Sequence, residues 1–367
     1  MLYYLLFNLR TKFIIFNLLR YITFRSLASF FTAFFIGMII APFFIKKLKR
    51  LGVKQPIRED GPESHLSKSG TPTMGGIFII VSVILSSLLW NIFNYYVFVV
   101  LISIIAFAGI GFYDDYLKIT MKNSKGIKAN LKLILQLTAG IIIFLLIYFN
   151  PFSSGFSWAF YIPFLNKPLF FWPPVFGVIF IIFPIVAFSN ATNLSDGLDG
   201  LAAGMSVFLI VPFGIMAYVI GNFLASDYLK FLFIPGAGEI AVILSAFIGG
   251  LAAFLWYNIY PAEVIMGDTG SLAIGGMIAT VAVILKQEVL LVIAGFMFVL
   301  ETLSVLIQTT YFKYTKNKYG AGKRFFLMAP IHHHFEKKGW KETQVVVRFW
   351  ILAALFALLS ITTLKIR

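Results

Sequence analysis

Residues 96–118 read YVFVVLISIIAFAGIGFYDDYLK, and the pattern of this stretch decides the fold. Its first 18 residues carry no charge. An α-helix needs ~20 apolar residues to cross a bilayer, so this run is close to the required length. The run then ends at an acidic pair, Asp114 and Asp115. The stretch therefore predicts a membrane-spanning helix with carboxylates at one end.

The composition of the 367-residue chain repeats this pattern on a larger scale. Residues of the types AVILMFWYC make up 60% of the sequence and charged residues 12%, whereas soluble globular proteins have ~25% charged residues. A water-soluble fold of this size cannot bury so much apolar surface, so we predict an integral membrane protein. Soluble enzymes, disordered regulators and secreted disulfide scaffolds are excluded. The chain has no cysteine, which also excludes thiolate metal sites and cysteine nucleophiles.

Ten apolar stretches are long enough to be membrane spans, and nothing between them resembles a separate globular domain. We predict an all-α, polytopic membrane protein with a single domain, residues 1–367. The predicted spans are 23–45, 75–93, 96–116, 131–150, 174–189, 201–220, 238–257, 271–286, 289–312 and 345–364. Pro184 and Pro212, in the fifth and sixth spans, predict a bend or support from neighbouring helices. Residues 1–22 lack a small-residue cleavage site, so we interpret them as an interfacial amphipathic stretch rather than a signal peptide.

Lysine and arginine are distributed unevenly between the two sides of these spans. The loops after the first, third and ninth spans, together with the adjoining span ends, hold 21 basic residues, and the loops and span ends on the opposite side hold three. Because cytoplasmic loops are enriched in Lys and Arg, we predict that these three loops are cytoplasmic and that both termini lie outside. Four basic residues before the first span run against this assignment: Arg10, Lys12, Arg20 and Arg25. The loop bias accounts for most of the net charge of +15, so the charge does not indicate nucleic-acid binding.

Four separate segments place carboxylates or imidazoles on the predicted cytoplasmic face. They contain Asp114 and Asp115, Asp196 and Asp199, Glu263 and Asp268, and His332, His333 and His334. Each segment also has an ordinary structural explanation: a solvated helix end for the first, a helix cap for the second and third, and a wet loop for the histidines. The gathering of all four on one face favours a functional site.

The acidic segments point to phosphate and metal binding. Asp196 and Asp199 lie three residues apart, on one face if the segment is helical, and Gly197 and Gly200 allow a ligand to approach the backbone. Asp268 stands between two glycines just before the eighth span. A carboxylate in such a setting suits Mg²⁺, a hard cation that prefers oxygen ligands.

Three further features are less specific. The adjacent histidines lack the spacing of a zinc site, which leaves phosphate binding or proton transfer. Residues 69–76, SGTPTMGG, follow Lys68 and have the composition of an oxyanion cradle, but they lack the Lys-Ser/Thr ending of an ATP-binding loop. Glu301 is an isolated carboxylate inside the ninth span, and such a residue is either functional or a structural hydrogen-bonding post.

Five motifs carry a resemblance to a known family. They are GTPTMGG (70–76), GFYDDYLK (111–118), NATNLSDGLDGLA (190–202), PAEVIMGDTGSL (261–272) and APIHHHFEKKGW (329–340). With these motifs in this order, the chain resembles the phospho-N-acetylmuramoyl-pentapeptide transferase (MraY) family over essentially its whole length. That family belongs to the polyprenyl-phosphate N-acetylhexosamine-1-phosphate transferase superfamily. The carboxylate motifs are shared across the superfamily, and the histidine motif points to the MraY family within it.

The resemblance implies an enzyme of the bacterial inner membrane that makes lipid I in the first membrane step of peptidoglycan synthesis. Its substrates would be UDP-N-acetylmuramoyl-pentapeptide (UDP-MurNAc-pentapeptide) and undecaprenyl phosphate, its second product UMP, and its cofactor Mg²⁺. The family also suggests that the protein forms a homodimer and contacts membrane lipid. The residues fit independently, because a soluble anionic nucleotide and a lipid phosphate would meet at the cytoplasmic surface, and phosphoryl transfer depends on positioning and charge neutralisation.

The resemblance also assigns roles to individual residues. Asp268 would be the metal ligand and a catalytic residue, and Asp114 the base or positioner of the lipid phosphate, with Asp115 beside it. The histidines at 332–334 would act in substrate binding or catalysis. The substrate-binding positions would be Lys68, Lys118, Lys132, Asn193, Asp196, Gly197, Leu198, Asp199 and Asn258. A phosphate monoester has a second pKa of ~6, so the base role of Asp114 is a hypothesis.

One position departs from the family pattern. The family commonly has Phe where this chain has Ile265, which cannot stack on uracil. Base–aromatic stacking is worth roughly 1–3 kcal/mol, so weaker nucleotide binding is expected unless another ring substitutes.

Two other functions stay open. A sister transferase that uses UDP-GlcNAc shares the aspartates, but the histidine motif disfavours it. A secondary transporter would place its polar site near the bilayer midplane.

Overall fold

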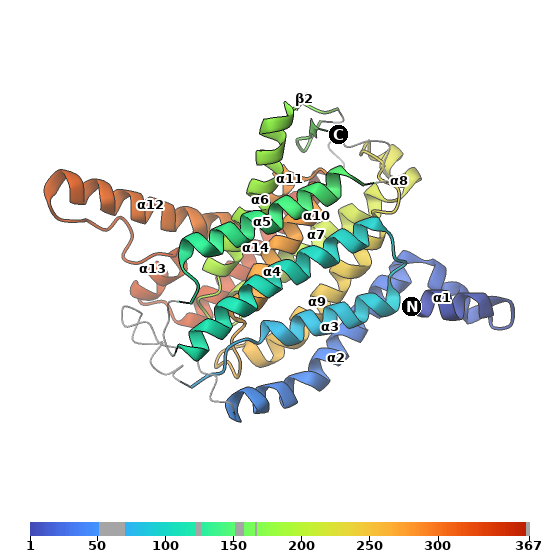
Figure 1. Ribbon diagram of the computed structural model, residues 1–367, viewed down its shortest axis with the longest axis horizontal. Coiled ribbons are helices and arrows are strands. Elements are labelled where there is room, and N and C mark those ends of the chain that lie inside the picture. Colours follow the sequence, from blue (N-terminus) through green and yellow to red (C-terminus); the bar gives the residue numbers. More distant parts are fainter. Residues whose placement is uncertain (51–69, 122–125, 151–157, 166, 365–367) are drawn as a thin grey trace.

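The computed structural model describes residues 1–50, 70–121, 126–150, 158–165 and 167–364, and these form a bundle of helices with one short pair of strands (Figure 1). The long helices are α2 (Ile22–Arg50), α3 (Gly76–Trp90), α4 (Tyr95–Thr120), α5 (Ala129–Tyr148), α6 (Pro174–Leu194), α7 (Leu201–Ile220), α9 (Glu239–Asn258), α10 (Gly267–Ile284), α12 (Phe296–Tyr319) and α14 (Glu342–Thr362). The short elements are α1 (Leu2–Leu6), η1 (Phe7–Thr11), η2 (Ile14–Arg20), α8 (Phe223–Tyr228), α11 (Glu288–Ala294), α13 (Ile331–Lys337) and the antiparallel strands β1 (Ala159–Phe160) and β2 (Phe170–Phe171).

These helices confirm the prediction of a polytopic α-helical membrane protein. Within the described ranges, eight helices are long and apolar enough to cross a membrane, and α11 together with α12 would make a ninth span. The second predicted span, 75–93, corresponds to α3, an apolar helix of 15 residues. Pro184 and Pro212 lie inside α6 and α7, and both helices continue through them.

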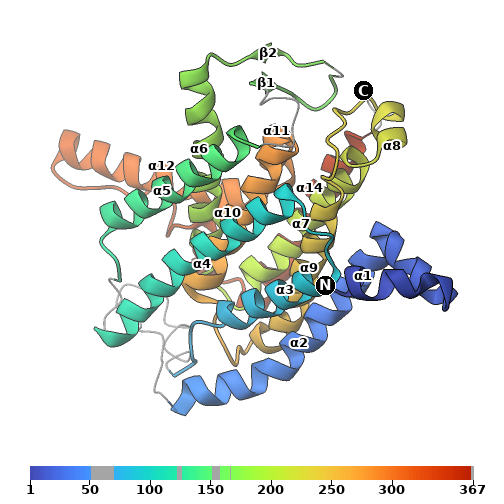
Figure 2. The ribbon, with the colours of Figure 1, turned by 45° about the vertical axis from the view of Figure 1, so that its right-hand side comes forward.

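The ninth predicted span, 289–312, is wrong as one continuous helix. The chain breaks between α11 and α12, whose axes differ by 82°. Gly295 stands at the break, where the ring of Phe188 packs so closely that a Cβ on residue 295 would overlap it. A run of apolar residues does not reveal such a break, because both helices are apolar. As a result α12 leaves the bundle, as both ribbon views show (Figures 1 and 2).

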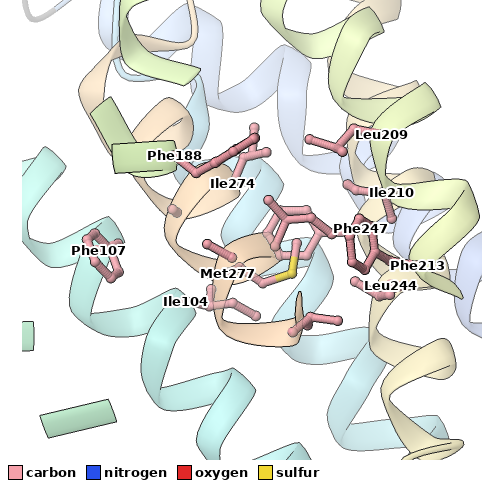
Figure 3. Close-up of a cluster of buried hydrophobic side chains, with 14 of the residues drawn as sticks. Ile104, Phe107, Phe188, Leu209, Ile210, Phe213, Leu244, Phe247, Ile274 and Met277 are labelled. Carbon is pink, nitrogen blue, oxygen red and sulfur yellow. The ribbon is translucent and has the colours of Figure 1, made fainter. Parts of the chain in front are cut away.

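Helix α10 lies at the centre of the bundle. Its residues 268–284 are all buried, and it packs against α3, α4, α6 and α7. Small residues permit this packing, since the ring of Phe107 lies directly against Gly276. Figure 3 shows Met277 of α10 among the apolar side chains of its neighbours. A helix that is apolar on every side needs an apolar surrounding, which is lipid or other helices, and neighbouring helices supply it for α10.

A buried ion pair joins α2 to α9 at the end of the bundle near the N-terminus. Arg25 donates to both carboxylate oxygens of Glu239, at 2.5 and 2.6 Å, and the two side chains are only 1% and 9% exposed. The N–H of Ile92 donates to the same carboxylate at 2.9 Å. The charge of Arg25 is therefore neutralised inside the fold, which removes it from the basic residues that oppose the predicted orientation.

The opposite end of the bundle gathers the polar motifs. Helices α4, α6 and α9 end there, and α3, α5, α7 and α10 begin there, as the contacts across their ends show. We call it the site end.

Candidate active site

Asp115, at the end of α4, caps helix α10. Its Oδ1 accepts the N–H of Asp268 at 3.0 Å, and its Oδ2 accepts the N–H and the hydroxyl of Thr269 at 2.9 and 2.7 Å. Met266, which precedes α10, makes no side-chain capping bond within the described part of the chain. A carboxylate from a neighbouring helix thus satisfies the first N–H groups of α10.

Two glycines bring the neighbouring helices up to this helix end. The carbonyl of Asp268 lies against Gly111 of α4, and the backbone of Gly270 lies against Gly76 of α3. In each case a Cβ on the glycine would overlap backbone atoms of α10. The approach of α4 that lets Asp115 reach α10 therefore requires a residue without a side chain at position 111.

The prediction that residues 69–76 could bind an oxyanion is wrong for two of their backbone N–H groups. The N–H of Gly75 donates to the carbonyl of Ile265 at 2.9 Å, and the N–H of Gly76 donates to the carbonyl of Met266 at 2.8 Å. Both groups are therefore used to join this segment to the start of α10.

Asp268 projects from the first turn of α10 among cationic and amide groups. Its Oδ2 lies 2.6 Å from Nζ of Lys132, on α5. Its Oδ1 lies 3.1 Å from Nζ of Lys118, on α4, and accepts a hydrogen bond from the amide of Asn193, on α6, at 2.9 Å. The N-terminus of a helix also favours negative charge. Three predicted substrate-binding residues thus converge on the predicted metal ligand.

Asp114 lies beside this cluster and is also buried. Its Oδ2 lies 2.5 Å from Nζ of Lys118, and its Oδ1 accepts the N–H of Ile127 at 2.8 Å. Lys118 therefore lies between Asp114 and Asp268. The Oδ2 of Asp114 makes no well-aligned hydrogen bond with the described residues.

Asp114, Asp115 and Asp268 form the candidate metal site among the described residues. One carboxylate oxygen from each lies within 4.8 Å of the others. An all-oxygen donor set suits a hard divalent cation. Each of these carboxylates already has protein partners. Asp115 accepts hydrogen bonds from α10, whereas Asp114 and Asp268 both lie against Lys118. The buried cluster is able to bind a divalent metal.

The loop between α6 and α7, residues 195–200, is anchored to the loop that follows α9. Asp199 accepts the N–H of Ala262 at 3.1 Å. Asn258 accepts the N–H of Gly200 at 2.9 Å, and its amide donates to the carbonyl of residue 264 at 2.8 Å. Asp199 and Asn258 therefore position the loop, whatever else they contact.

Asp196 faces the start of α10 from this loop, and the N–H of Gly267 approaches its carboxylate. Burial, followed by the negative charges of three neighbouring carboxylates, raises the pKa of Asp196 to about 8. Leu198 is only 4% exposed, so it offers a ligand its main chain rather than its side chain.

The first histidine is enclosed in the protein. His332 and Glu301 are both 0% exposed, and Nδ1 of the ring lies 3.0 Å from Oε1 of the carboxylate. The Nε2 edge of the ring lies against Gly197, so closely that a Cβ on residue 197 would overlap it. This contact joins α13 to the loop 195–200.

The other two histidines have different partners. Nδ1 of His333 lies 2.7 Å from the carboxylate of Glu336, and Nδ1 of His334 accepts the N–H of Leu327 at 3.1 Å. Burial lowers the pKa of His333, although the Glu336 carboxylate opposes that shift. Burial and the charge of Lys338 lower the pKa of His334. Both shifts favour the neutral imidazole.

The predicted site residues form two adjoining groups. The polar cluster contains Asp114, Asp115, Lys118, Lys132, Asn193 and Asp268, and the neighbouring group contains Asp196, Gly197, Leu198, Asp199, Asn258, His332, His333 and His334. The prediction for Lys68 lies outside the described residues.

Two further carboxylates support the site, and the sequence predicted the contact of neither. Glu342, in the first turn of α14, accepts the N–H of Asp199 at 2.9 Å. Glu301 contacts His332, and its sequence position left a functional and a structural role open. No spacing in the sequence signals either contact, because the partners lie 143 and 31 residues apart.

Comparison with known proteins agrees with the motif resemblance. The model of Glycosyl transferase family 4 matches residues 97–286, and Phospho-N-acetylmuramoyl-pentapeptide-transferase signature 1 matches residues 68–80. Relatives named phospho-N-acetylmuramoyl-pentapeptide-transferase occur in Thermodesulfovibrio yellowstonii, Desulfosudis oleivorans and Desulfotalea psychrophila. They are 48%, 46% and 45% identical to this chain, and each match covers 100% of both sequences. The chain therefore belongs to the phospho-N-acetylmuramoyl-pentapeptide transferase family, a family of phosphosugar transferases of the bacterial inner membrane.

Proposed function

We propose that this protein transfers phospho-MurNAc-pentapeptide from UDP-MurNAc-pentapeptide to undecaprenyl phosphate, forming lipid I and releasing UMP. The observation that carries the proposal is the convergence of Asp114 and Asp268 with Lys118 and Lys132 at one end of a membrane bundle. Two anionic phosphate groups, one from a nucleotide and one from a lipid, must meet in this reaction. The names of the full-length relatives support the choice of substrates.

The net reaction makes one P–O bond and breaks another. A phosphate oxygen of undecaprenyl phosphate attacks the sugar-bound phosphorus of the donor. The bond from that phosphorus to the bridging oxygen breaks, and UMP leaves with this oxygen and its electron pair. Because anions approach each other, groups that neutralise charge stabilise the transition state most. Lys118 and Lys132 carry the positive charges that we expect to contact the phosphates.

We propose Mg²⁺ as the cofactor, held by Asp268. When bound, it would neutralise the charge of the diphosphate. The protein's own residues hold the ligand in place: Asn193 donates to Asp268, and Asp115 caps the helix that carries it. Asp114 would position the lipid phosphate. It has little need to act as a base, since a phosphate monoester is largely deprotonated above its second pKa of ~6.

The loop 195–200 and Asn258 would hold the uridine nucleotide beside α10, and Lys68 would add a further contact to phosphate. The histidines at 332–334 would line the same side of the site. We place the site end in the cytoplasm because the basic loops lie there, and we expect the protein to act as a homodimer.

UMP release by the purified protein in detergent tests the proposal. Undecaprenyl phosphate and Mg²⁺ are present throughout, and UDP-MurNAc-pentapeptide or UDP-GlcNAc is supplied in separate reactions. We expect release from the muramoyl donor alone, and a loss of about 100-fold or more in D268N. The matched control is D227N, since Asp227 lies on α8 at the other end of the bundle with a 73% exposed side chain.

The outcomes separate the candidate functions. Release from UDP-GlcNAc alone would keep the phosphosugar chemistry and overturn the donor. Normal turnover in D268N, or turnover without any divalent cation, would remove the proposed metal site. Equal losses in D268N and D227N would show a general effect of the substitutions on folding.

A further inference from the structure

Glu301 has no role in the mechanism above, and both Glu301 and its partner His332 are fully enclosed. Glu301 lies on α12, the helix that leaves the bundle, and His332 lies in the first turn of α13. Their side chains are each 0% exposed, and Nδ1 lies 3.0 Å from Oε1. The pair therefore joins α12 to the segment that carries the histidines.

Two polar atoms of this pair are unsatisfied. Oε2 of Glu301 and Nε2 of His332 are buried and make no hydrogen bond with the described residues. A buried polar atom without a partner costs about 1–3 kcal/mol, so stability alone does not explain the arrangement. With Glu301 accepting the Nδ1–H, the ring takes the tautomer in which Nε2 keeps its lone pair.

The unpaired Nε2 faces one particular segment, the loop 195–200. It lies against Gly197, where no side chain other than hydrogen would fit. The preceding residue, Asp196, approaches the N–H of Gly267 at the start of α10. A continuous set of contacts thus runs from Glu301 through His332 and the loop to the helix that carries Asp268.

We propose that Glu301 is a positioning residue that controls nucleotide affinity through His332. It holds the imidazole against Gly197, and the imidazole holds loop 195–200 in the conformation that binds the uridine nucleotide. An N–H of that loop would donate to Nε2 once the nucleotide is bound. Glu301 itself, being enclosed, touches no substrate. This inference rests on the proposed function, which assigns the nucleotide to the loop.

The test compares E301A with the wild-type protein in two measurements: UMP binding by calorimetry, and turnover with UDP-MurNAc-pentapeptide and undecaprenyl phosphate. We expect both the Kd for UMP and the KM for the donor to rise about tenfold in E301A, which corresponds to ~1.4 kcal/mol. We expect kcat to stay within about threefold, because no group that touches the reacting phosphates has changed.

Two further variants at position 301 separate the effect of the hydrogen bond to His332 from the effects of the carboxylate charge and of side-chain length. E301Q keeps an oxygen that accepts the Nδ1–H, so its affinities should stay near wild type. E301D keeps the charge but shortens the side chain by one methylene, so it should behave like E301A. Thermal unfolding of each variant checks that it is folded, and the E301Q–E301D comparison stands even where E301A does not fold.

A double-mutant cycle shows whether Glu301 acts through His332. In an H332A background, E301A should have no further effect on UMP affinity. The matched control on the same helix is T302A, whose hydroxyl donates only to the carbonyl of Phe298 within α12. Its affinities should equal those of the wild type.

The contradicting results are distinct. An E301A effect of full size in the H332A background would show that Glu301 acts independently of the histidine. A fall in kcat with unchanged KM would place His332 in the chemical step instead. If the wild type is active and E301A has an unaltered Kd for UMP and KM for the donor, this inference alone is overturned. If the wild type has no transferase activity, the proposed function is overturned, and this inference with it.

Discussion

Adjacent residues of the acidic pair at the end of α4 have different surroundings. Neighbours on a helix point ~100° apart, so Asp115 turns toward α10 and Asp114 toward Lys118 and the loop that precedes α5. Asp115 uses both oxygens as hydrogen-bond acceptors for α10. Asp114 lies beside Lys118 and the Asp268 carboxylate, and its Oδ2 makes no well-aligned hydrogen bond with the described residues. The pair thus combines a cap for α10 with a carboxylate that pairs with Lys118.

The side chain at position 265 should limit nucleotide affinity. Ile265 is 9% exposed, and its backbone is held by hydrogen bonds to Pro72 and Gly75. In I265F an aromatic ring would stack on uracil, so we expect the KM for the donor to fall about tenfold, within the roughly 1–3 kcal/mol range for base stacking. Steady-state kinetics with varied donor measures this. The control is I265L, which adds no ring; an unchanged KM in I265F would contradict the stacking argument.

Protonation of His333 should destabilise the protein in acid. Its pKa is lowered in the folded state, so the unfolded chain, with a pKa of ~6.5, binds the proton more tightly. The stability contributed by the neutral ring is therefore fully present above about pH 6.5 and is lost as the pH falls below it. We expect Tm to fall by a few degrees less in H333Q than in the wild type between about pH 7.5 and 5.5.

The control for this pH dependence is H334Q. Its ring also has a lowered pKa but is only half-buried, so its removal should change the pH dependence less. An H333Q protein with the same acid sensitivity as the wild type would show that the acid transition belongs to other groups.

At the scale of the elements, the site depends on how closely α4 approaches α10. The helix end that carries Asp268 is capped from α4 and bounded by glycines of α3 and α4. A side chain at either glycine would push the helices apart, and Asp115 would then lose its contact with α10. The geometry of the site is therefore a property of helix packing as much as of the loops.

Replacement of Gly111 by alanine should disrupt the site. The new Cβ would overlap the carbonyl of Asp268, and relieving that overlap would displace the carboxylate. Overpacking of this kind costs about 1–3 kcal/mol of stability, and a displacement of 1 Å at a reacting group can cost about 100-fold in rate. We expect G111A to lower Tm and to reduce turnover about 100-fold, measured by thermal unfolding and UMP release.

The same helix offers a matched control in Gly109, which has open space where a Cβ would lie. G109A should keep full activity and gain slightly in stability, since Ala is favoured over Gly in a helix. If G109A lost as much activity as G111A, the effect would come from α4 itself and not from its contact with α10.

At the scale of the whole molecule, the two buried clusters of charged residues lie at opposite ends of the bundle. The site end holds the carboxylate cluster, and the other end holds the enclosed Arg25–Glu239 pair. Because α12 leaves the bundle at a steep angle to α11, its basic residues extend away from the core (Figures 1 and 2). This arrangement agrees with one face for catalysis and the other for structure.

The orientation of the bundle can be tested directly because the chain has no cysteine. Single cysteines at exposed Lys316, near the end of α12, and at exposed Asp227, on α8, would report the two sides. With a membrane-impermeant maleimide on intact spheroplasts, we expect D227C to be labelled and K316C to be labelled about tenfold less until the membrane is permeabilised. The reverse pattern would invert the proposed topology.

The local sequence was sufficient for the family and for most of the helices, but not for the break between α11 and α12. Apolar runs of about membrane thickness have few alternatives to a helix, because an unpaired backbone polar group is too costly in lipid. The polar residues that interrupt those runs therefore marked the ends of helices and the segments of the site. The family resemblance placed Asp268, Lys118 and Lys132 in one site, and the structure brings them within ion-pair distance.

Tertiary packing decided what these residues contact. The cap that Asp115 provides for α10, the pairing of Glu301 with His332, and the break at Gly295 all depend on partners from other helices. Such contacts leave no period or spacing in the sequence, since they arise from how closely two helices approach. The sequence by itself thus determined the membrane fold and the chemistry available, and only the packed bundle decided which carboxylate caps a helix and which ones lie against the two lysines.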